Sequence, residues 1–343
     1  MTMHRIIGWW DDHQVLLYMA AILAGAAVGL AAPQLAPALE HSIEPVLILL
    51  LFATFLAVPL IEVGKAFRDI RFLGTVLVAN FIIIPAVVFG LSRFVADDRG
   101  LMVGVLLVLL TPCIDYVIVF SGIAGGASAR LLAATPLLML VQILLLPVYL
   151  FLFAGSDVLN VIDAGPFLKA FLLLIVLPLA SAAVVQGIAR RHRAGQAIEK
   201  IMAGAMVPLM MVTLAVVIGS QIAAVGSQVL NLTRVIPLYV AFVIIAVIIG
   251  KVAGLAARLD VPSTRAAMFS ATTRNSLVVL PLALALPPAL SIAPLAVVTQ
   301  TLVELVAMVV LVRIVPIIVP EPESHHLTSR KFATRGGAEQ LKN

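Results

Sequence analysis

The stretch TPCIDY, residues 111–116, interrupts an apolar run that extends from residue 101 to residue 124. A helix needs about 20 apolar residues to cross a bilayer, so this run has the length of a membrane span. Pro112 lacks a backbone N–H and disfavours helical geometry at Thr111. Asp115 is an ionisable residue at membrane depth, where a charge is costly and indicates a functional site. The sequence therefore predicts a broken transmembrane helix with a polar site at its break.

A second break of the same kind lies in the apolar run 265–287, where residues 272–276 read TTRNS. Arg274 places a positive charge inside that run. Unwound backbone at membrane depth is tolerated only where it lines a cavity or meets another part of the protein. We therefore expect the two breaks to lie against each other.

The overall composition is that of a membrane protein. Of the 343 residues, 62% are hydrophobic and 11% are charged, whereas soluble domains average about 25% charged residues. We predict an all-α polytopic protein of the plasma membrane with ten transmembrane helices, of which the fourth and the ninth are discontinuous and cross. The predicted spans are residues 14–33, 43–62, 72–94, 101–124, 129–153, 165–189, 201–223, 234–257, 265–287 and 291–319.

The chain also has a doubled pattern. Around each break, a broken span is followed by a short turn of small residues and then by a very apolar span. At a shift of 162 residues, Gln142 corresponds to Glu304 and Pro112 corresponds to Arg274. Each repeat holds five spans, an odd number, so the two repeats must be inverted in the membrane. Inverted repeats with interrupted helices are typical of secondary transporters, whose site lies near the midplane.

Basic residues indicate the orientation of the chain. Lys and Arg gather in the loops after even-numbered spans and in the tail, while the opposite loops carry few. Cytoplasmic loops carry such an excess, so both termini are predicted to be cytoplasmic. Topology also explains the net charge of +5 without nucleic acid as a partner. The predicted units are a cytoplasmic N-terminus (1–13), a first repeat (14–153), a second repeat (165–319) and a disordered cytoplasmic tail (320–343).

Two opposed breaks would present helix ends to a solute. N-terminal helix ends favour anions and C-terminal ends favour cations. Cys113 is the only cysteine of the chain, and a lone cysteine is more often a small buried hydrophobe than a ligand. The candidate substrate-binding residues are Cys113, Thr111, Tyr116, Thr272, Thr273, Asn275 and Ser276.

Three ionisable residues are candidates for coupling transport to a gradient. Asp115 and Arg274 carry opposite charges inside the broken spans, so they would form an ion pair if the helices cross. A proton or a substrate that displaces one partner could then switch the conformation. Glu304 lies in the middle of the tenth predicted span. The alternatives are that Arg274 is only a structural clamp on Asp115, and that Glu304 only hydrogen-bonds neighbouring Thr or Gln side chains.

Residues for enzymatic chemistry are missing from the predicted spans. All six histidines lie outside these spans, and the single cysteine excludes an internal disulfide and a thiolate-rich metal site. An intramembrane metalloenzyme would need histidine or carboxylate ligands at depth. No phosphate-binding loop is present. We expect no enzymatic activity and no cofactor, and transport driven by an ion or proton gradient. A receptor that does not transport would not need the paired breaks.

Cys113, followed by VIVF at residues 117–120 and IAGG at residues 123–126, resembles the fourth span of the arsenical-resistance arsenite permeases. That family belongs to the bile acid/arsenite/riboflavin transporter superfamily. FSATTRNSL at residues 269–277 is similar to the ninth-span motif of the same family. The resemblance implies a five-plus-five inverted fold with a core domain and a panel domain. It also implies efflux of arsenite or antimonite by proton antiport.

The family's cysteine maps onto Cys113, which would hold trivalent arsenic transiently because a single thiolate binds it without trapping it. Ser276 stands where the family has a ninth-span glutamate, while Asp115 and Arg274 stand where it usually has uncharged residues. We therefore predict Asp115 as proton carrier and Arg274 as its partner, with a proton or sodium gradient across the lipid bilayer. The alternative is a sodium- or proton-coupled transporter of an organic or inorganic anion bound by Arg274.

Overall fold

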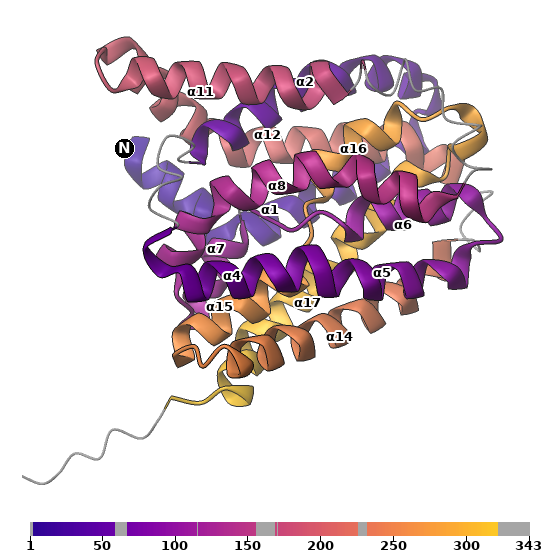
Figure 1. The fold of residues 1–343 in the computed structure, drawn as a ribbon. Helices are drawn as coiled ribbons and strands as arrows, with labels where there is room; N and C mark the ends of the chain where they lie inside the picture. Colours follow the sequence, from indigo (N-terminus) through magenta and orange to yellow (C-terminus); the bar gives the residue numbers. More distant parts are fainter. Residues whose placement is uncertain are drawn as a thin grey trace, which may run out of the picture.

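The computed structural model is an assembly of helices, most of which lie side by side along one direction (Figure 1). Within the residues that the structure describes, no β-strand is formed, and the only β-type pairing is a single isolated bridge. The described residues are 3–58, 67–114, 116–155, 169, 171–225 and 232–321.

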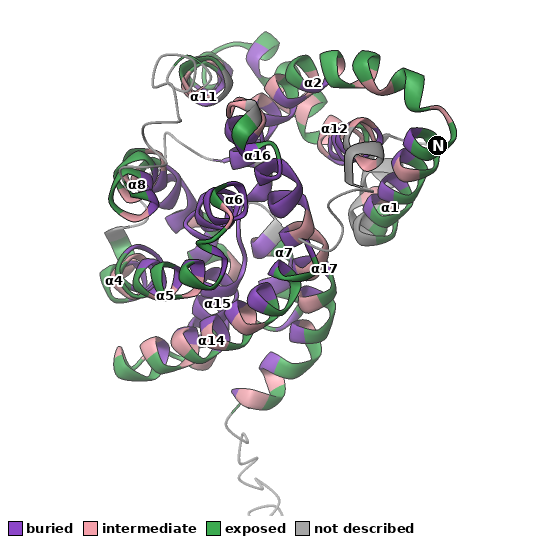
Figure 2. Cartoon of the chain, turned by 90° about the vertical axis from the view of Figure 1, so that its right-hand side faces the viewer, coloured by how far each residue is buried: buried purple, intermediate pink, exposed green. Residues whose placement is uncertain are grey.

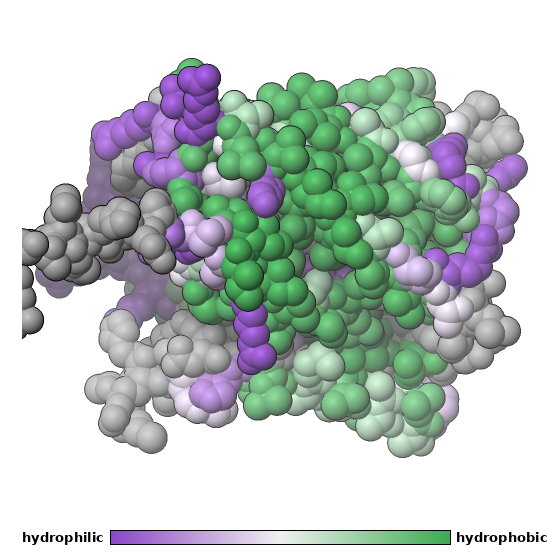
Figure 3. Space-filling view, turned by 90° about the horizontal axis from the view of Figure 1, so that it is seen from below, coloured by the Kyte–Doolittle hydropathy of each residue, from purple (hydrophilic) through white to green (hydrophobic). Residues whose placement is uncertain are grey.

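In the part of the chain that the structure describes, six helical segments are long and apolar enough to cross a membrane. Apolar side chains form a broad band between two more polar ends of the molecule (Figure 3). The prediction of a polytopic helical membrane protein is therefore confirmed. Helices lie within all ten predicted ranges, but the broken spans are made of short pieces, so the ten crossings and the inverted repeats stay predictions. Among the described residues, the six segments are Pro33–Ala57, Ile70–Val95, Ser128–Ala154, Arg193–Ser220, Val235–Ala256 and Ala293–Ile318.

A first group of helices combines residues 3–57 with residues 172–225, which pack together. α1 lies against α12, which also packs on α2 and α11. Gly25 and Gly29 allow this close approach, because a Cβ there would lie 2.4 Å from the backbone oxygen of Ala215 and 2.3 Å from that of Gly219. The group comprises α1 (Met3–Ala31), η1 (Pro33–Leu35), α2 (Ala36–Ala57), η6 (Leu172–Val176), α11 (Leu177–Ala189) and α12 (Arg193–Val225).

A second group of helices holds both broken spans. Burial is concentrated here, on α6, α15 and α16 (Figure 2). Contacts to the first group run mainly through α16, which packs against α2 and η6. The group comprises η3 (Phe67–Asp69), α4 (Ile70–Val78), η4 (Ala79–Ile83), α5 (Ile84–Ser92), η5 (Arg93–Val95), α6 (Arg99–Leu109), α7 (Tyr116–Ile123), α8 (Ser128–Ala154), α14 (Val235–Ala256), α15 (Val261–Thr272), α16 (Ser276–Leu284), η7 (Pro288–Leu290) and α17 (Ala293–Ile318).

The first half of each broken span begins with an aspartate cap. Asp98 accepts a hydrogen bond from the N–H of Leu101 at the start of α6, and Asp260 accepts one from Ser263 at the start of α15. An aspartate at this position satisfies a backbone donor that the helix itself leaves free. Asp98 and Asp260 are 162 residues apart. This spacing equals the shift between the two predicted repeats.

Ion pairs outside the apolar band join the pieces of the second group. Arg130, on the first turn of α8, lies 3.2 Å from Asp69 and 2.9 Å from Asp260. At the other end of the group, Arg234 contacts Asp97 at 2.7 Å. The hydrogen bond from Arg234 holds the pKa of Asp97 below its ordinary value. These exposed pairs fix the ends of helices α4, α8, α14 and α15 but contribute little free energy each.

Candidate functional site: the crossing of two broken helices

Both predicted breaks are present as gaps between two half-helices. α6 ends at Leu109 and α7 begins at Tyr116, while α15 ends at Thr272 and α16 begins at Ser276. Each gap has a local cause that the sequence indicated. A proline, which cannot extend a helix, lies in the first gap, and side chains that compete for backbone hydrogen bonds lie in the second. The chain therefore exposes backbone N–H and C=O groups in the middle of the second group of helices.

The two gaps satisfy each other's backbone groups. Pro112 and Arg274 form the isolated antiparallel bridge, and the residues beside them are fully buried. The bridge confirms that the breaks lie against each other, as buried unwound backbone requires. Its hydrogen bonds run from the N–H of Cys113 to the carbonyl of Thr273 (3.0 Å) and from the N–H of Asn275 to the carbonyl of Thr111 (2.8 Å).

The side chain of Arg274 is fully buried and binds acceptors from three elements. Its Nη2 donates to Asn80 Oδ1 and to the carbonyl of Ser270, both at 2.9 Å, and also to the carbonyl of Ala271. Its Nη1 donates to the carbonyl of Leu109 at 3.3 Å. The guanidinium thus caps the C-terminal ends of α15 and α6, where a cation interacts favourably with the helix dipoles.

Asn80 connects a third span to the crossing. It lies in the π-helical turn η4, which precedes Pro85, a residue that cannot donate to the helical hydrogen-bond ladder. Asn80 is fully buried, donates to Ser270 Oγ at 3.1 Å and accepts from Arg274. The sequence did not single out this asparagine, and the π-turn around it is seen only in the folded structure.

Glu304, on α17, lies at the second break. Its Oε2 accepts the backbone N–H of Arg274 at 3.0 Å and a hydrogen bond from the amide of Gln300. One turn along the same helix, Thr301 Oγ1 donates to Ser276 Oγ at 2.8 Å. The alternative prediction is that Glu304 only hydrogen-bonds neighbouring Thr or Gln side chains. Glu304 does bind Gln300, but its buried carboxylate also contacts the unwound backbone directly.

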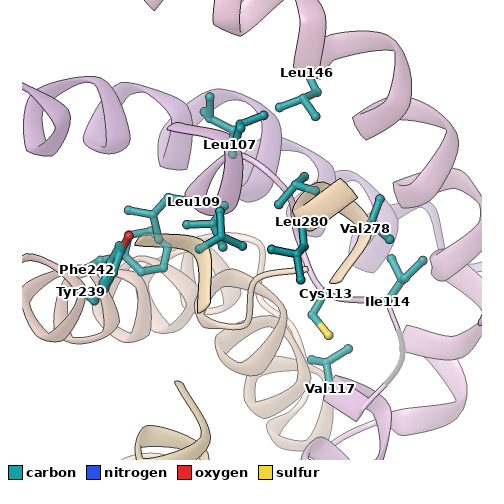
Figure 4. Close-up of a cluster of buried hydrophobic side chains, with 14 of the residues drawn as sticks. Leu107, Leu109, Cys113, Ile114, Val117, Leu146, Tyr239, Phe242, Val278 and Leu280 are labelled. Carbon is teal, nitrogen blue, oxygen red and sulfur yellow. The ribbon is translucent and has the colours of Figure 1, made fainter. Parts of the chain in front are cut away.

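Cys113 lies at the crossing, but its sulfur lies in a cluster of apolar side chains (Figure 4). The cysteine is fully buried and is not part of a disulfide. Val117 lies next to the sulfur, and Val278 and Leu280 of α16 flank the same cluster. The surroundings in this conformation are those of a small buried hydrophobe. A soft ligand would reach the thiol only if the cluster opens.

The predicted hydroxyl groups mainly serve their own helices. The Oγ1 atoms of Thr111, Thr272 and Thr273 donate to carbonyls of the preceding turn, at distances of 2.7–3.1 Å. Asn275 caps α16 by accepting the N–H of Val278 at 3.3 Å. Each oxygen can still accept a hydrogen bond from a solute, because a hydroxyl or amide oxygen has a second lone pair.

Three buried amide side chains keep polar atoms that have no partner among the described residues. These atoms are both side-chain polar atoms of Gln142, Nδ2 of Asn275 and Oε1 of Gln300. All three residues are at most 2% exposed. Buried polar atoms are nearly always hydrogen-bonded in native proteins, so these atoms are candidate contacts for a solute or for water.

Two of the predicted site residues cannot be placed in this way. Asp115 lies outside the described residues, so its predicted ion pair with Arg274 stays a prediction. Tyr116 opens α7, but its side chain lies outside the description as well. The structure does bring together Thr111, Cys113, Thr272, Thr273, Arg274, Asn275, Ser276 and Glu304.

Arg265, the first residue of the ninth predicted span, is a structural residue that the sequence did not single out. It belongs to the first half of the ninth predicted span and is only 5% exposed. Its guanidinium donates to the carbonyls of Ala124 and Val319, near the ends of α7 and α17, at 3.2 and 3.0 Å. No local pattern distinguishes it from a charge at a membrane surface, since its acceptors come from distant parts of the chain.

Comparison with known proteins supports the prediction of a membrane transporter. The sequence profile of the sodium bile acid symporter family matches residues 44–228, more than half of the chain. The chain belongs to this family. The family's members are membrane transporters of small ions or solutes rather than enzymes, and the predicted superfamily is therefore confirmed. No curated protein matched the chain.

Proposed function

We propose that this protein is a proton-coupled secondary transporter that exports arsenite and antimonite from the cell. The observation that carries the proposal is the bridge between the two broken helices, which places Cys113 beside Arg274, Asn275 and the Glu304 carboxylate. Interrupted helices that face each other form the substrate site in many secondary transporters. The family match supports transport, and the resemblance of the first break to arsenite permeases supports the substrate.

The state of Arg274 favours an uncharged substrate. Trivalent arsenic is an uncharged trihydroxide in neutral water, and each of its hydroxyl groups can donate and accept a hydrogen bond. The guanidinium of Arg274 already donates to Asn80 and to the carbonyls at the ends of two half-helices. An anion would have to compete with these acceptors. A trihydroxide needs only the remaining lone pairs and amide groups of the crossing.

The pattern of the two repeats explains why Gln142 could contact the substrate. Glu304 accepts the N–H of Arg274 at the second break. At the shift of 162 residues the equivalent residues are Gln142 and Pro112, and proline has no N–H to donate. Gln142 lies on the buried face of α8, which packs against both α6 and α7. Its amide is thus left for a ligand that both donates and accepts.

Coupling to protons requires a carboxyl group that changes its charge during the cycle. Such a group must also contact the part of the site that moves. Glu304 does so, because its carboxylate accepts the backbone N–H of Arg274 at the second break. Protonation would weaken its acceptance of that N–H and would favour a different arrangement of the crossing. Asp115, which belongs to the first break in sequence and is the carrier that the sequence predicts, is the other candidate.

In the membrane we propose ten spans in two inverted repeats of five, with both termini in the cytoplasm and the protein in the plasma membrane. The two groups of helices would correspond to the core and panel domains that the resemblance implies. Movement of one group against the other would expose the crossing alternately to each side. Access to Cys113 would also need a rearrangement within the second group, because α7 and α16 both contribute to the apolar cluster around it.

Replacement of Cys113 by serine tests the substrate assignment. In inside-out vesicles, arsenite uptake by Cys113→Ser should fall at least about 10-fold, since a hydroxyl is a poor ligand for soft trivalent arsenic. Cys113→Ala should behave the same way, and both variants should match the wild type in yield and in thermal unfolding. Arsenite uptake that is unchanged in both variants would rule out the thiol as a ligand.

An anion transporter is the second candidate, and the family match favours it. The family is named for symport of sodium with bile acids, which are organic anions. In this case Arg274 would release its carbonyl acceptors and bind the carboxylate of the solute. Vesicles that take up a radiolabelled organic anion but not arsenite would support this candidate over arsenite export.

A further inference from the structure

The guanidinium of Arg274 lies where the C-terminal ends of two half-helices converge. It donates to the carbonyls of Ser270 and Ala271 in the last turn of α15, and to that of Leu109 at the end of α6. Such carbonyls are the groups that coordinate coupling cations in transporters with broken helices. We infer that this guanidinium permanently occupies, as a tethered cation, the position where the crossing would otherwise bind sodium.

The described residues do not fit a sodium ion at this position while Arg274 is in place. Sodium needs a shell of oxygen ligands, and the candidate oxygens here already accept from the guanidinium, including Asn80 Oδ1 at 2.9 Å. The carbon at the centre of the guanidinium also lies 5.3 Å from the centroid of the Phe242 ring, so the space beside it is filled. The oxygens would have to release the guanidinium before they could surround an ion.

Electrostatics lead to the same conclusion. Arg274 is fully buried, and Glu304 is the one buried acid among the described residues. A sodium ion would add a second positive charge beside the guanidinium in a low-dielectric environment. The repulsion and the loss of hydration would both oppose binding. A cation that is covalently attached cannot be released at the other side of the membrane, so this position cannot carry a sodium gradient.

The family is named for symport with sodium, but the crossing of this protein would not need sodium. Arg274 would stabilise the crossing without sodium, and the coupling of transport would not depend on sodium at this site. The role in coupling rests on the proposed function. The binding prediction does not, because it can be tested without any substrate. Failure to transport arsenite and response to sodium are therefore separate results.

Thermal unfolding of the purified full-length protein in detergent tests the inference. Sodium chloride is substituted for choline chloride at constant ionic strength, with potassium chloride as a second comparison. The wild type should show the same apparent Tm in all three salts. Arg274→Gln removes the tethered charge and frees the carbonyls, so sodium should raise its apparent Tm by about 3 °C or more relative to choline.

Two further variants make the result specific. Arg274→Lys keeps a cation at the crossing and should show no sodium response. Arg265→Gln also removes a buried arginine from helix-end carbonyls, but away from the bridge, and should be less stable without any sodium response. A sodium-specific rise in the wild type or in Arg274→Lys would overturn the inference. A folded Arg274→Gln protein that does not respond to sodium would overturn it as well. If Arg274→Gln does not fold, the wild type and Arg274→Lys test the inference, and a sodium-specific rise in the apparent Tm of either would overturn it.

Discussion

A buried guanidinium is costly to remove from water unless acceptors replace the water molecules that it loses. Arg274 meets this requirement with backbone carbonyls from two half-helices and with the side chain of Asn80. The same contacts hold the ends of α6 and α15 together. Burial of Arg274 therefore costs free energy of desolvation, and the same residue fixes the geometry of the crossing.

Asn80→Ala should destabilise the crossing. The change removes one acceptor of Arg274 and the hydrogen bond to Ser270, both fully buried, so we expect a loss of about 2 kcal/mol. The apparent Tm in detergent measures the effect. Thr75→Ala is the matched control, because Thr75 lies in the same span but donates only to its own helix. Equal apparent Tm values for the two variants would show that Asn80 does not support the guanidinium.

The two candidate proton carriers can be separated by neutral replacements. Glu304→Gln keeps an acceptor for the N–H of Arg274 but cannot be protonated, so arsenite flux should continue while its stimulation by a pH gradient is lost. Asp115→Asn should retain that stimulation if Glu304 is the carrier. The flux is measured with and without an imposed pH gradient. Stimulation that survives in Glu304→Gln and is lost in Asp115→Asn would reverse the assignment.

At the residue scale, the sequence shows which polar side chains are expensive to bury, but it does not show which groups they bind. Cys113, Arg274 and Glu304 could be singled out because such residues are rare within apolar runs. The acceptors of Arg274 could not, since two are backbone carbonyls of α15 and one belongs to α6. Any residue supplies a carbonyl, so only the packed structure shows which ones converge.

The two broken helices could be predicted as elements because their causes are local. Pro112 cannot extend a helix, and the run at residues 272–276 offers side chains that compete with the backbone for hydrogen bonds. Their pairing across the interface was inferred from the need to satisfy buried backbone, and the bridge confirms it. The π-turn at Asn80 was not predicted, because it depends on how α4 and α5 pack around Pro85.

Close packing of α14 against α15 supports the second break, and Gly250→Ala tests it. A Cβ at Gly250 would lie 2.5 Å from the Cα of Met268, so the helices would have to separate at a cost of about 2 kcal/mol. Gly74→Ala is the control, because a Cβ at Gly74 meets no atom within 4 Å. We expect a lower apparent Tm for the first variant only. A Gly250→Ala protein as stable as the wild type would contradict the tight packing.

At the scale of the whole molecule, the two groups of helices contact each other mainly through α16. An interface this limited allows one group to move relative to the other. α16 also forms the second half of the ninth predicted span, so it connects the crossing with the first group. Composition predicted the membrane class, but the division into these groups depends on contacts between helices that are distant in sequence.

The orientation of the chain can be tested with single cysteines. In a Cys113→Ser background, His41→Cys and Arg191→Cys place thiols at exposed positions in loops predicted to face opposite sides. A membrane-impermeant maleimide added to intact cells should label His41→Cys, and it should label Arg191→Cys only after the membrane is permeabilised. The reverse pattern would invert the proposed topology.

The central claim is that the crossing couples arsenite export to protons, and concentrative flux in vesicles measures this most directly. Inside-out vesicles with an acidic lumen, in sodium-free buffer, should accumulate arsenite above its external concentration. A protonophore should abolish the accumulation, and vesicles without the protein should show none. Accumulation that requires sodium, or the absence of arsenite accumulation under a verified pH gradient, would contradict the account.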